Sequence, residues 1–163
     1  MENIIDVYYD TDEYQKFAPE EFVLSYLEKV LGAVGLSGVE FSVTFATEDH
    51  IHQLNKEYRD IDDSTDILSF AAEDEDEDGT PFFVAEEARV LGDMIICPEV
   101  LKANAQTFNV MPEEELRRLL IHGVLHLSGE NHSTNDPSEP ITAIVEVVPL
   151  IFSAKERILW LVV

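Results

Sequence analysis

Residues 122–132 read HGVLHLSGENH, and this stretch limits the possible fold more than any other part of the chain. His122 and His126 are four residues apart, so on a helix their imidazole rings share one face, one turn apart. We expect that helix to run from Pro112 to Ser128. It also carries an apolar stripe suited to packing on a sheet, formed by Leu116, Leu120, Val124 and Leu127.

A third histidine follows a predicted turn. Gly129 can adopt the positive φ that reverses a chain sharply, which would bring His132 back toward His122 and His126. Three neutral imidazoles leave a tetrahedral metal ion one open position for water, as in a catalytic site. The chain has only 5 histidines, so three within one short motif favour a metal site over ordinary core histidines. His50 and His52 are two apart, would face different ways, and are expected at the surface.

The spacing of the motif equals the metzincin protease pattern, H-E-x-x-H-x-x-G-x-x-H, in every position but one. Gly123 stands where that pattern has its catalytic glutamate. Glycine cannot accept a proton, so a peptidase would need a base from elsewhere. We therefore expect metal-assisted hydrolysis, with a metalloprotease as a weaker alternative.

Strands and helices are mixed along the rest of the chain without a repeating βαβ unit. The hydrophobic patterns predict strands over residues 3–9, 39–45, 66–72 and 90–97. They predict helices over residues 19–32, from Thr47 to about Tyr58, 98–109 and 112–128, and from Pro140 to a break at Pro149. We expect an α+β fold: one compact domain, residues 1–163, with a mixed β-sheet of about four strands packed against helices.

The balance of charge is strongly acidic. The 163 residues include 34 Asp and Glu against 10 Lys and Arg, a net charge of −24. Such a field repels polyanions, so composition alone argues against a nucleic-acid partner. The run at residues 73–78 is all acidic and predicts a solvated loop, because the pattern of an EF-hand calcium site is absent.

Targeting signals and disulfides are not expected. No stretch approaches the roughly 20 apolar residues that span a bilayer, and the first residues, MENIIDVYYD, do not resemble a signal peptide. Cys97 is the only cysteine and lies in an apolar run, so we expect a buried, inert thiol. These features predict a cytoplasmic protein that does not contact membranes.

Four stretches, taken in order, resemble the YbeY endoribonuclease family of bacterial rRNA maturation factors. They are LNKEYRDIDDSTDILSF at residues 54–70, LGDMIICPEV at 91–100, the helix leading into the histidine motif, and the motif itself. The resemblance covers roughly residues 40–132. It implies a compact α+β domain that holds one zinc ion through His122, His126 and His132. It also implies a single-strand-specific endoribonuclease acting in 16S rRNA 3′-end maturation and ribosome quality control.

The resemblance further marks Arg59 as a catalytic and substrate-binding residue near the metal, with Lys56 as a weaker substrate-binding candidate. A guanidinium offers a planar fork of donors suited to a phosphate. A surface ion pair with one of the many carboxylates explains Arg59 equally well. Asp66 and Asp93 also match family positions, and either could accept a hydrogen bond from a histidine ring. Asp66 could instead cap a turn.

Two departures from the family leave parts of the mechanism open. Glu130-Asn131 replaces the usual Tyr-Asp before the third histidine, and the prolines after His132 interrupt the usual acidic helix. The general base is therefore open between metal-activated water, Glu130 and an RNA 2′-hydroxyl. A non-catalytic ribosome assembly factor with a structural metal is a further alternative.

The implied partners are single-stranded rRNA and the ribosomal small subunit or one of its proteins. Net acidity conflicts with RNA binding unless one of three conditions holds. A local basic cleft could contact the strand, drawing on Lys56, Arg59, Arg117 and Arg118. High salt could screen the repulsion. Docking on a basic ribosomal protein could bring the chain to its substrate.

Overall fold

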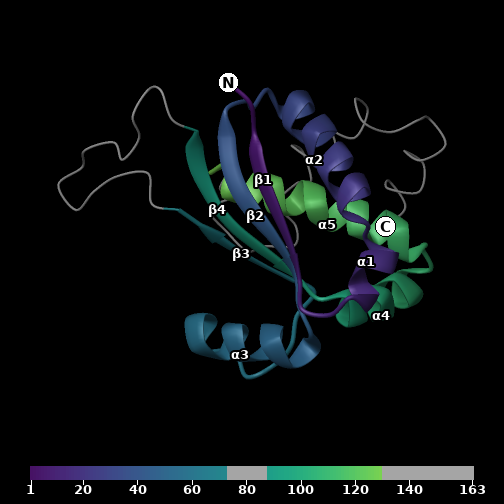
Figure 1. Cartoon of the computed structure of the whole chain (residues 1–163). Helices are drawn as coiled ribbons and strands as arrows, with labels where there is room; N and C mark the ends of the chain where they lie inside the picture. The colour runs from purple at the N-terminus through teal and green to yellow at the C-terminus, as the bar shows by residue number, and fades with distance from the viewer. Residues whose placement is uncertain (73–87, 130–163) are drawn as a thin grey trace.

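The computed structural model describes residues 1–72 and 88–129 (Figure 1). In chain order the elements are β1 (Ile4–Tyr9), α1 (Glu13–Phe17), α2 (Glu20–Val34), β2 (Val39–Phe45), α3 (Glu48–Arg59), β3 (Ile67–Ala71), β4 (Arg89–Ile96), α4 (Pro98–Phe108) and α5 (Pro112–Leu127). Within these ranges, no helix is long and apolar enough to cross a bilayer. The acidic run at 73–78, His132 and the helix predicted from Pro140 lie outside the described residues.

The strands form one mixed sheet in the order β1-β2-β4-β3. β1 pairs parallel with β2, β2 pairs parallel with β4, and β3 runs antiparallel to β4 at the edge. The α+β class and the four-stranded mixed sheet are therefore confirmed. Each predicted strand lies within a residue or so of its observed bounds.

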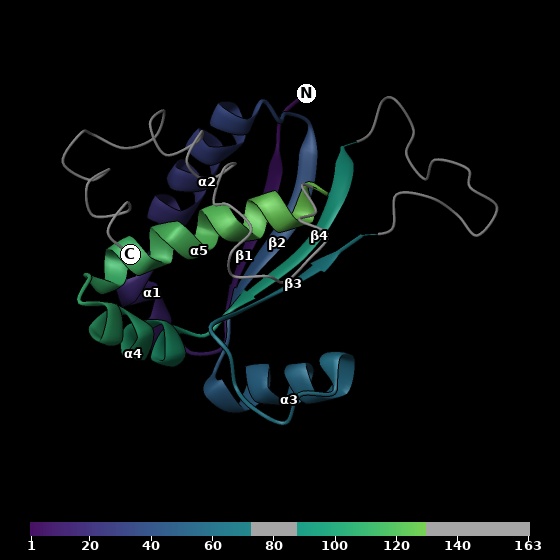
Figure 2. The same cartoon turned by 180° about the vertical axis from the view of Figure 1, so that it is seen from behind.

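The two faces of the sheet have different covers. In β2, Val39, Phe41, Val43 and Phe45 are buried while the residues between them are partly exposed. The buried side packs against α2 and α5 in the main core, and Figure 2 shows both helices lying across it. Fully burying one such side chain contributes about 1.5–3 kcal/mol. α5 is thus held by the core rather than by its own helix propensity.

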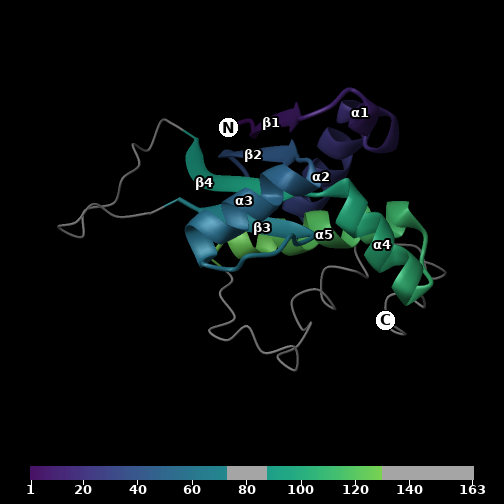
Figure 3. The same ribbon diagram turned by 90° about the horizontal axis from the view of Figure 1, so that it is seen from below.

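α3 covers the opposite face of the sheet, toward the end where β2 stops (Figures 1 and 3). A second cluster joins Ile51 of this helix to Leu68 of β3 and Ile95 of β4, with Leu54 packed against it. Ser42, Thr44 and Asp93 on the same face are not buried. Consequently Arg59, the last residue of α3, and the histidines of α5 come from helices on different sides of the sheet.

The helix ends follow the predicted signals. The Thr47 hydroxyl accepts a hydrogen bond from the His50 backbone N–H at 3.3 Å, which caps α3. Pro98 and Pro112 are the first residues of α4 and α5. α2 runs past the predicted end to Val34, and Gly35 at φ 75° terminates it.

Helix α1 was not predicted. It has five residues, EYQKF, which is too short for an apolar repeat to be visible. Its position depends on tertiary contacts instead. The buried Tyr14 donates a hydrogen bond to Glu99 Oε1 of α4 at 2.5 Å, and Tyr9 donates one to Ala18 O at 2.5 Å.

Candidate metal and phosphate site

His122 and His126 lie together on α5, as the spacing predicted. Their ring centroids are 4.3 Å apart with planes inclined by 53°. Both residues are half-buried, while Ile121, Val124 and Leu125 beside them are buried. The core therefore fixes the helix, and the two rings emerge at its margin, where an ion from solvent can reach them.

Gly123 between them packs directly on the sheet. A Cβ built on it would lie 2.2 Å from Met94 Cε and 2.5 Å from Met94 Sδ of β4. Real side chains never approach this closely, so the glycine permits α5 to sit near β4. A glutamate at this position, as in the metzincins, would point into the core. The sequence had shown only that a base was missing, not that position 123 faces the sheet.

The two histidines are chemically suited to a metal ion. Neutral imidazole is a common ligand of zinc, and copper and nickel also bind it. Adjacent rings on one helix face can supply two ligands to the same ion. No cluster of three His, Cys, Asp or Glu residues suited to a metal occurs within residues 1–72 and 88–129. His132, the third predicted ligand, lies outside those ranges, so its convergence on the pair stays a prediction.

Arg59 is exposed at the end of α3, and its Nη2 lies 3.5 Å from Ser69 O on the edge strand β3. In the described part of the chain, no carboxylate lies within 4.0 Å of this guanidinium. That geometry disfavours the surface ion pair considered from sequence. The contact with Ser69 O leaves further N–H donors of the fork for a ligand.

Lys56 is placed differently. Its Nζ lies 3.8 Å from Asp62 Oδ1, the same oxygen that contacts His52 Nε2 at 2.8 Å. The hydrogen bond from His52, followed by the charge of Lys56, lowers the pKa of Asp62 below its usual value. Lys56 therefore faces a carboxylate at an exposed site, and it is less available to a phosphate than Arg59.

Asp66 has a local structural role. Its Oδ1 accepts a hydrogen bond from the Ile67 backbone N–H at 2.8 Å, and its Oδ2 lies 3.4 Å from Asn104 Nδ2 of α4. The Asp66 carbonyl accepts a further bond from Cys97 N. These contacts join the start of β3 to the end of β4, as expected of a turn-capping residue.

Asp93 lies on the sheet face opposite α5. Its Oδ1 accepts a hydrogen bond from Ser42 Oγ at 2.6 Å. The next residue, Met94, points to the α5 side, where it meets Gly123. Because neighbouring residues of a strand face opposite ways, Asp93 does not reach the histidine face. Asp93 therefore does not face His122 or His126 of α5.

A β-bulge in β4 determines which face of the sheet Asp93 and Met94 each occupy. Glu40 pairs with Val90 and Phe41 with Gly92, so Leu91 is an extra residue. Gly92 has φ 128°, and a Cβ there would lie 2.0 Å from Phe70 O. Only glycine fits this position. The bulge was not predicted, although Gly92 inside a predicted strand is a signal that could have indicated it.

Cys97 is buried at the end of β4, as predicted for an inert thiol. Burial raises its pKa to about 11, and the nearby Glu99 carboxylate adds to the effect. Its Sγ lies 3.6 Å from Glu99 Oε2. A raised pKa and burial both disfavour the thiolate near neutral pH, as expected for an inert thiol.

Comparisons with a family model, with related sequences and with a solved structure all point to one family. Residues 5–148 match the family described as Endoribonuclease YbeY. The chain is 38% identical to Endoribonuclease YbeY of Treponema denticola over 90% of its own length and 91% of that protein. It is 44% identical to the Bacillus subtilis protein of the same name, over 61% of this chain and 64% of that one. The solution structure of TM1509 from Thermotoga maritima is similar, with a TM-score of 0.59 and 26% identity over 96% of this chain and 89% of that one.

Proposed function

The chain belongs to the YbeY endoribonuclease family, and from that premise we propose that it is a zinc-dependent endoribonuclease specific for single-stranded RNA. The observation that carries this proposal is the pair His122 and His126, whose rings lie 4.3 Å apart on a helix within the matched region. We propose that residues 1–163 form one metallohydrolase domain. Its biological substrate would be 16S rRNA, at the 3′-end maturation step and in ribosome quality control.

We assign the metal to His122, His126 and His132. A bound zinc ion would supply Lewis acidity and a water of lowered pKa at neutral pH. The role of the chain is to hold three neutral imidazoles at the margin of the core. The packing of Gly123 on Met94 supports this role, because it fixes the height of α5 above the sheet.

Although α3 and α5 lie on different sides of the sheet, Arg59 reaches the edge strand β3 through Ser69 O. From this edge it would bind the scissile phosphate and stabilise the charge that develops on it. Its donors form a planar fork that matches two phosphate oxygens. Within residues 1–72 and 88–129 no carboxylate compensates its charge, which leaves that charge available to the substrate. Lys56 would contribute less, since Asp62 already lies beside it.

The other arginines considered from sequence have partners within the protein. Arg118 Nη2 lies 2.5 Å from Glu115 Oε1, and that carboxylate is buried. Arg117 stacks over the Phe22 ring at 5.6 Å. These contacts give little support to a local basic cleft that includes Arg117 and Arg118. We propose that the acidic chain reaches rRNA in the cytoplasm by docking on a basic protein of the ribosomal small subunit, where opposite charge favours association.

A metalloprotease is disfavoured, because position 123 faces Met94 and leaves no space for a catalytic glutamate.

The discriminating experiment uses purified protein with single-stranded RNA, the matching duplex and a peptide library. We expect cleavage of the single strand only, lost in His122→Ala and retained in His52→Ala, a histidine of α3 outside the site. Cleavage of peptides with RNA intact would contradict the proposal.

A further inference from the structure

A hollow of about 540 Å³ lies on the sheet face opposite α5. The residues that line it come from all four strands and from α3. None of the residues that line it is His122, His126 or Arg59. Its volume falls within the range of small-molecule sites, roughly 300–1,000 Å³.

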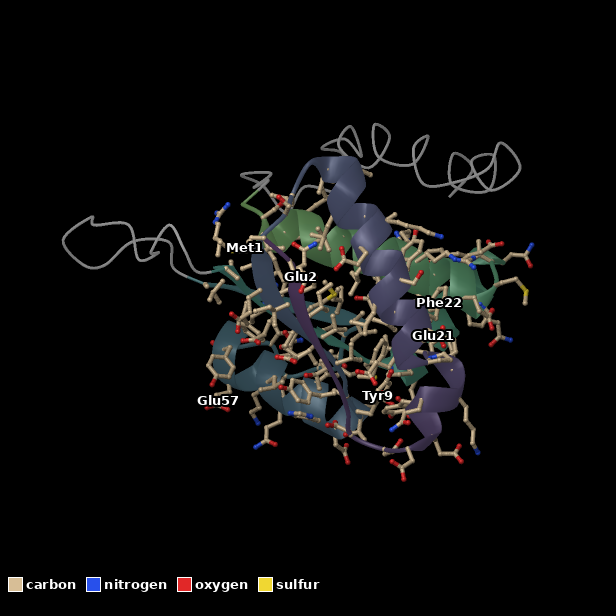
Figure 4. All side chains as sticks on the ribbon, turned by 45° about the horizontal axis from the view of Figure 1, so that its top comes forward. Met1, Glu2, Tyr9, Glu21, Phe22 and Glu57 are labelled. Carbon is tan, nitrogen blue, oxygen red and sulfur yellow. The ribbon has the colours of Figure 1, made fainter. Side chains whose placement is uncertain are left out.

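Aromatic rings line the hollow. Tyr58 of α3 packs edge-on against Phe70 of β3, with centroids 5.3 Å apart and planes at 64°. Tyr8 of β1 lines it from the opposite side. Tyr8 and Tyr58 are 55% and 64% exposed, so much of each side chain faces solvent. Figure 4 shows the neighbouring Glu57 projecting outward from α3, away from the strands.

The floor carries a hydrogen-bonding pair. Ser42 Oγ donates to Asp93 Oδ1 at 2.6 Å, which orients the carboxylate. No described group donates to the second oxygen, and a carboxylate can only accept. The Gly92 bulge turns Asp93 toward this face rather than toward α5. The hollow thus combines aromatic walls with an oriented carboxylate, and the polar side chains of Thr44 and His50 also line it.

We propose that this hollow is a subsite for one base of a single-stranded RNA, selective for bases that carry an exocyclic amino group. This inference rests on the proposed function. Single-stranded RNA is commonly bound by stacking of bases on aromatic side chains over a sheet, with hydrogen bonds to the base edge. An amino group would donate to Asp93. Uracil has a single donor on that edge, N3–H, flanked by two carbonyl oxygens that the carboxylate repels, so it should bind more weakly than a base with an amino group.

The positive charge of Arg59 would offset the repulsion between the Asp93 carboxylate and the phosphate of a nucleotide. It follows Tyr58 in α3, and its Nη2 contacts Ser69 O, the residue before Phe70. The guanidinium therefore adjoins two residues that line the hollow. A neutral base would enter beside Asp93 while its phosphate meets Arg59. A lysine or arginine side chain of a protein partner would suit the carboxylate but would be repelled by Arg59.

The test is a titration of the ¹⁵N-labelled full chain with cytidine and with uridine, which differ at the 4-amino or 4-oxo group. Cytidine should shift the amide signals of Ser42, Tyr58 and Asp93, with an affinity roughly tenfold above that of uridine. Tyr58→Ala should weaken cytidine binding roughly tenfold or more. Phe108→Ala, an exposed aromatic at the end of α4, should change nothing. Asp93→Asn should reduce or reverse the preference, since an amide can also donate.

Equal affinity for the two nucleosides, no saturable shift with either, or unchanged binding by Tyr58→Ala would overturn the inference. So would N-acetylarginine amide shifting these signals when cytidine does not. The outcomes separate the two proposals. RNA cleavage without nucleoside selectivity rejects only the base subsite. Selective nucleoside binding by a chain that cleaves no RNA rejects the nuclease.

Discussion

Gly123 of α5 lies so close to Met94 of β4 that no other residue can take its place without displacing the methionine side chain. Met94 is fully buried, so it has little room to move. This contact sets the distance between the helix and the sheet, and the flanking His122 emerges at the resulting edge. In the sequence, Gly123 is notable because it replaces the catalytic glutamate of the metzincin motif. In the structure, its role is to pack against the sheet.

Gly123→Ala should lower the free energy of unfolding by up to about 2 kcal/mol. Overpacking costs about 1–3 kcal/mol, and the gain in helix propensity of about 1 kcal/mol offsets part of it. Urea unfolding of Gly123→Ala, Met94→Ala and the double variant measures the coupling. The substitution should cost less when Met94 is already truncated. A stabilised Gly123→Ala, or additive effects in the double variant, would show that the contact is loose.

Gly92→Ala should be more damaging, because the obstructing atoms belong to the backbone of β3 and cannot rotate away. We expect a loss of about 3 kcal/mol or more, from strain at φ 128° and separation of the strands. Gly32→Ala is the matched control. It lies in α2 with nothing within 4 Å of the added methyl, so it should stabilise by about 0.5–1 kcal/mol. A similar loss of stability in Gly92→Ala and Gly32→Ala would contradict the requirement for glycine at the bulge.

The sequence predicted most of the fold because alternation and helix signals are local. The buried residues of β2, the Thr47 cap and the prolines that begin α4 and α5 all follow this rule. The pair His122 and His126 was found for the same reason, since its geometry is set by helix spacing. Helix α1, the Gly92 bulge and the side of the sheet on which Asp93 lies depend on contacts far apart in the chain. The hollow beside Tyr58 was likewise invisible, because its walls come from separate elements.

Arg59→Ala should reduce kcat/KM for single-stranded RNA by roughly 100-fold to 1,000-fold, the usual cost of removing one donor to a developing charge. Arg59→Lys should recover only part of the loss, because an ammonium cannot form the planar fork. Lys56→Ala should have a much smaller effect, since Asp62 already lies beside Lys56. Steady-state cleavage of one oligonucleotide by all three variants makes the comparison. Equal losses at Lys56 and Arg59 would indicate a general role of positive charge.

Cys97 should resist alkylation in the folded chain. Its pKa of about 11 lies above the usual 9.0, so folding favours the neutral thiol. The resulting contribution to stability is complete below pH 9 and is lost as the pH rises toward 11. Iodoacetamide labelling at pH 8, followed by mass spectrometry, should show slow modification that accelerates on addition of urea. Fast labelling of the native chain would mean that the thiol is exposed.

Removal of metal should abolish RNA cleavage and leave the fold in place. The core between the sheet, α2 and α5 is buried without any contribution from the histidine rings. Far-UV circular dichroism should therefore change little on chelation, while activity is lost and returns with zinc. Chelation that unfolds the chain would favour a structural metal instead.

The metal content of the chain purified without added metal tests the central claim most directly. Elemental analysis should find one zinc ion per chain in the unmodified protein and in His52→Ala, and almost none in His122→Ala or His126→Ala. Full zinc in both α5 variants, or no bound metal in the unmodified protein, would contradict the assignment.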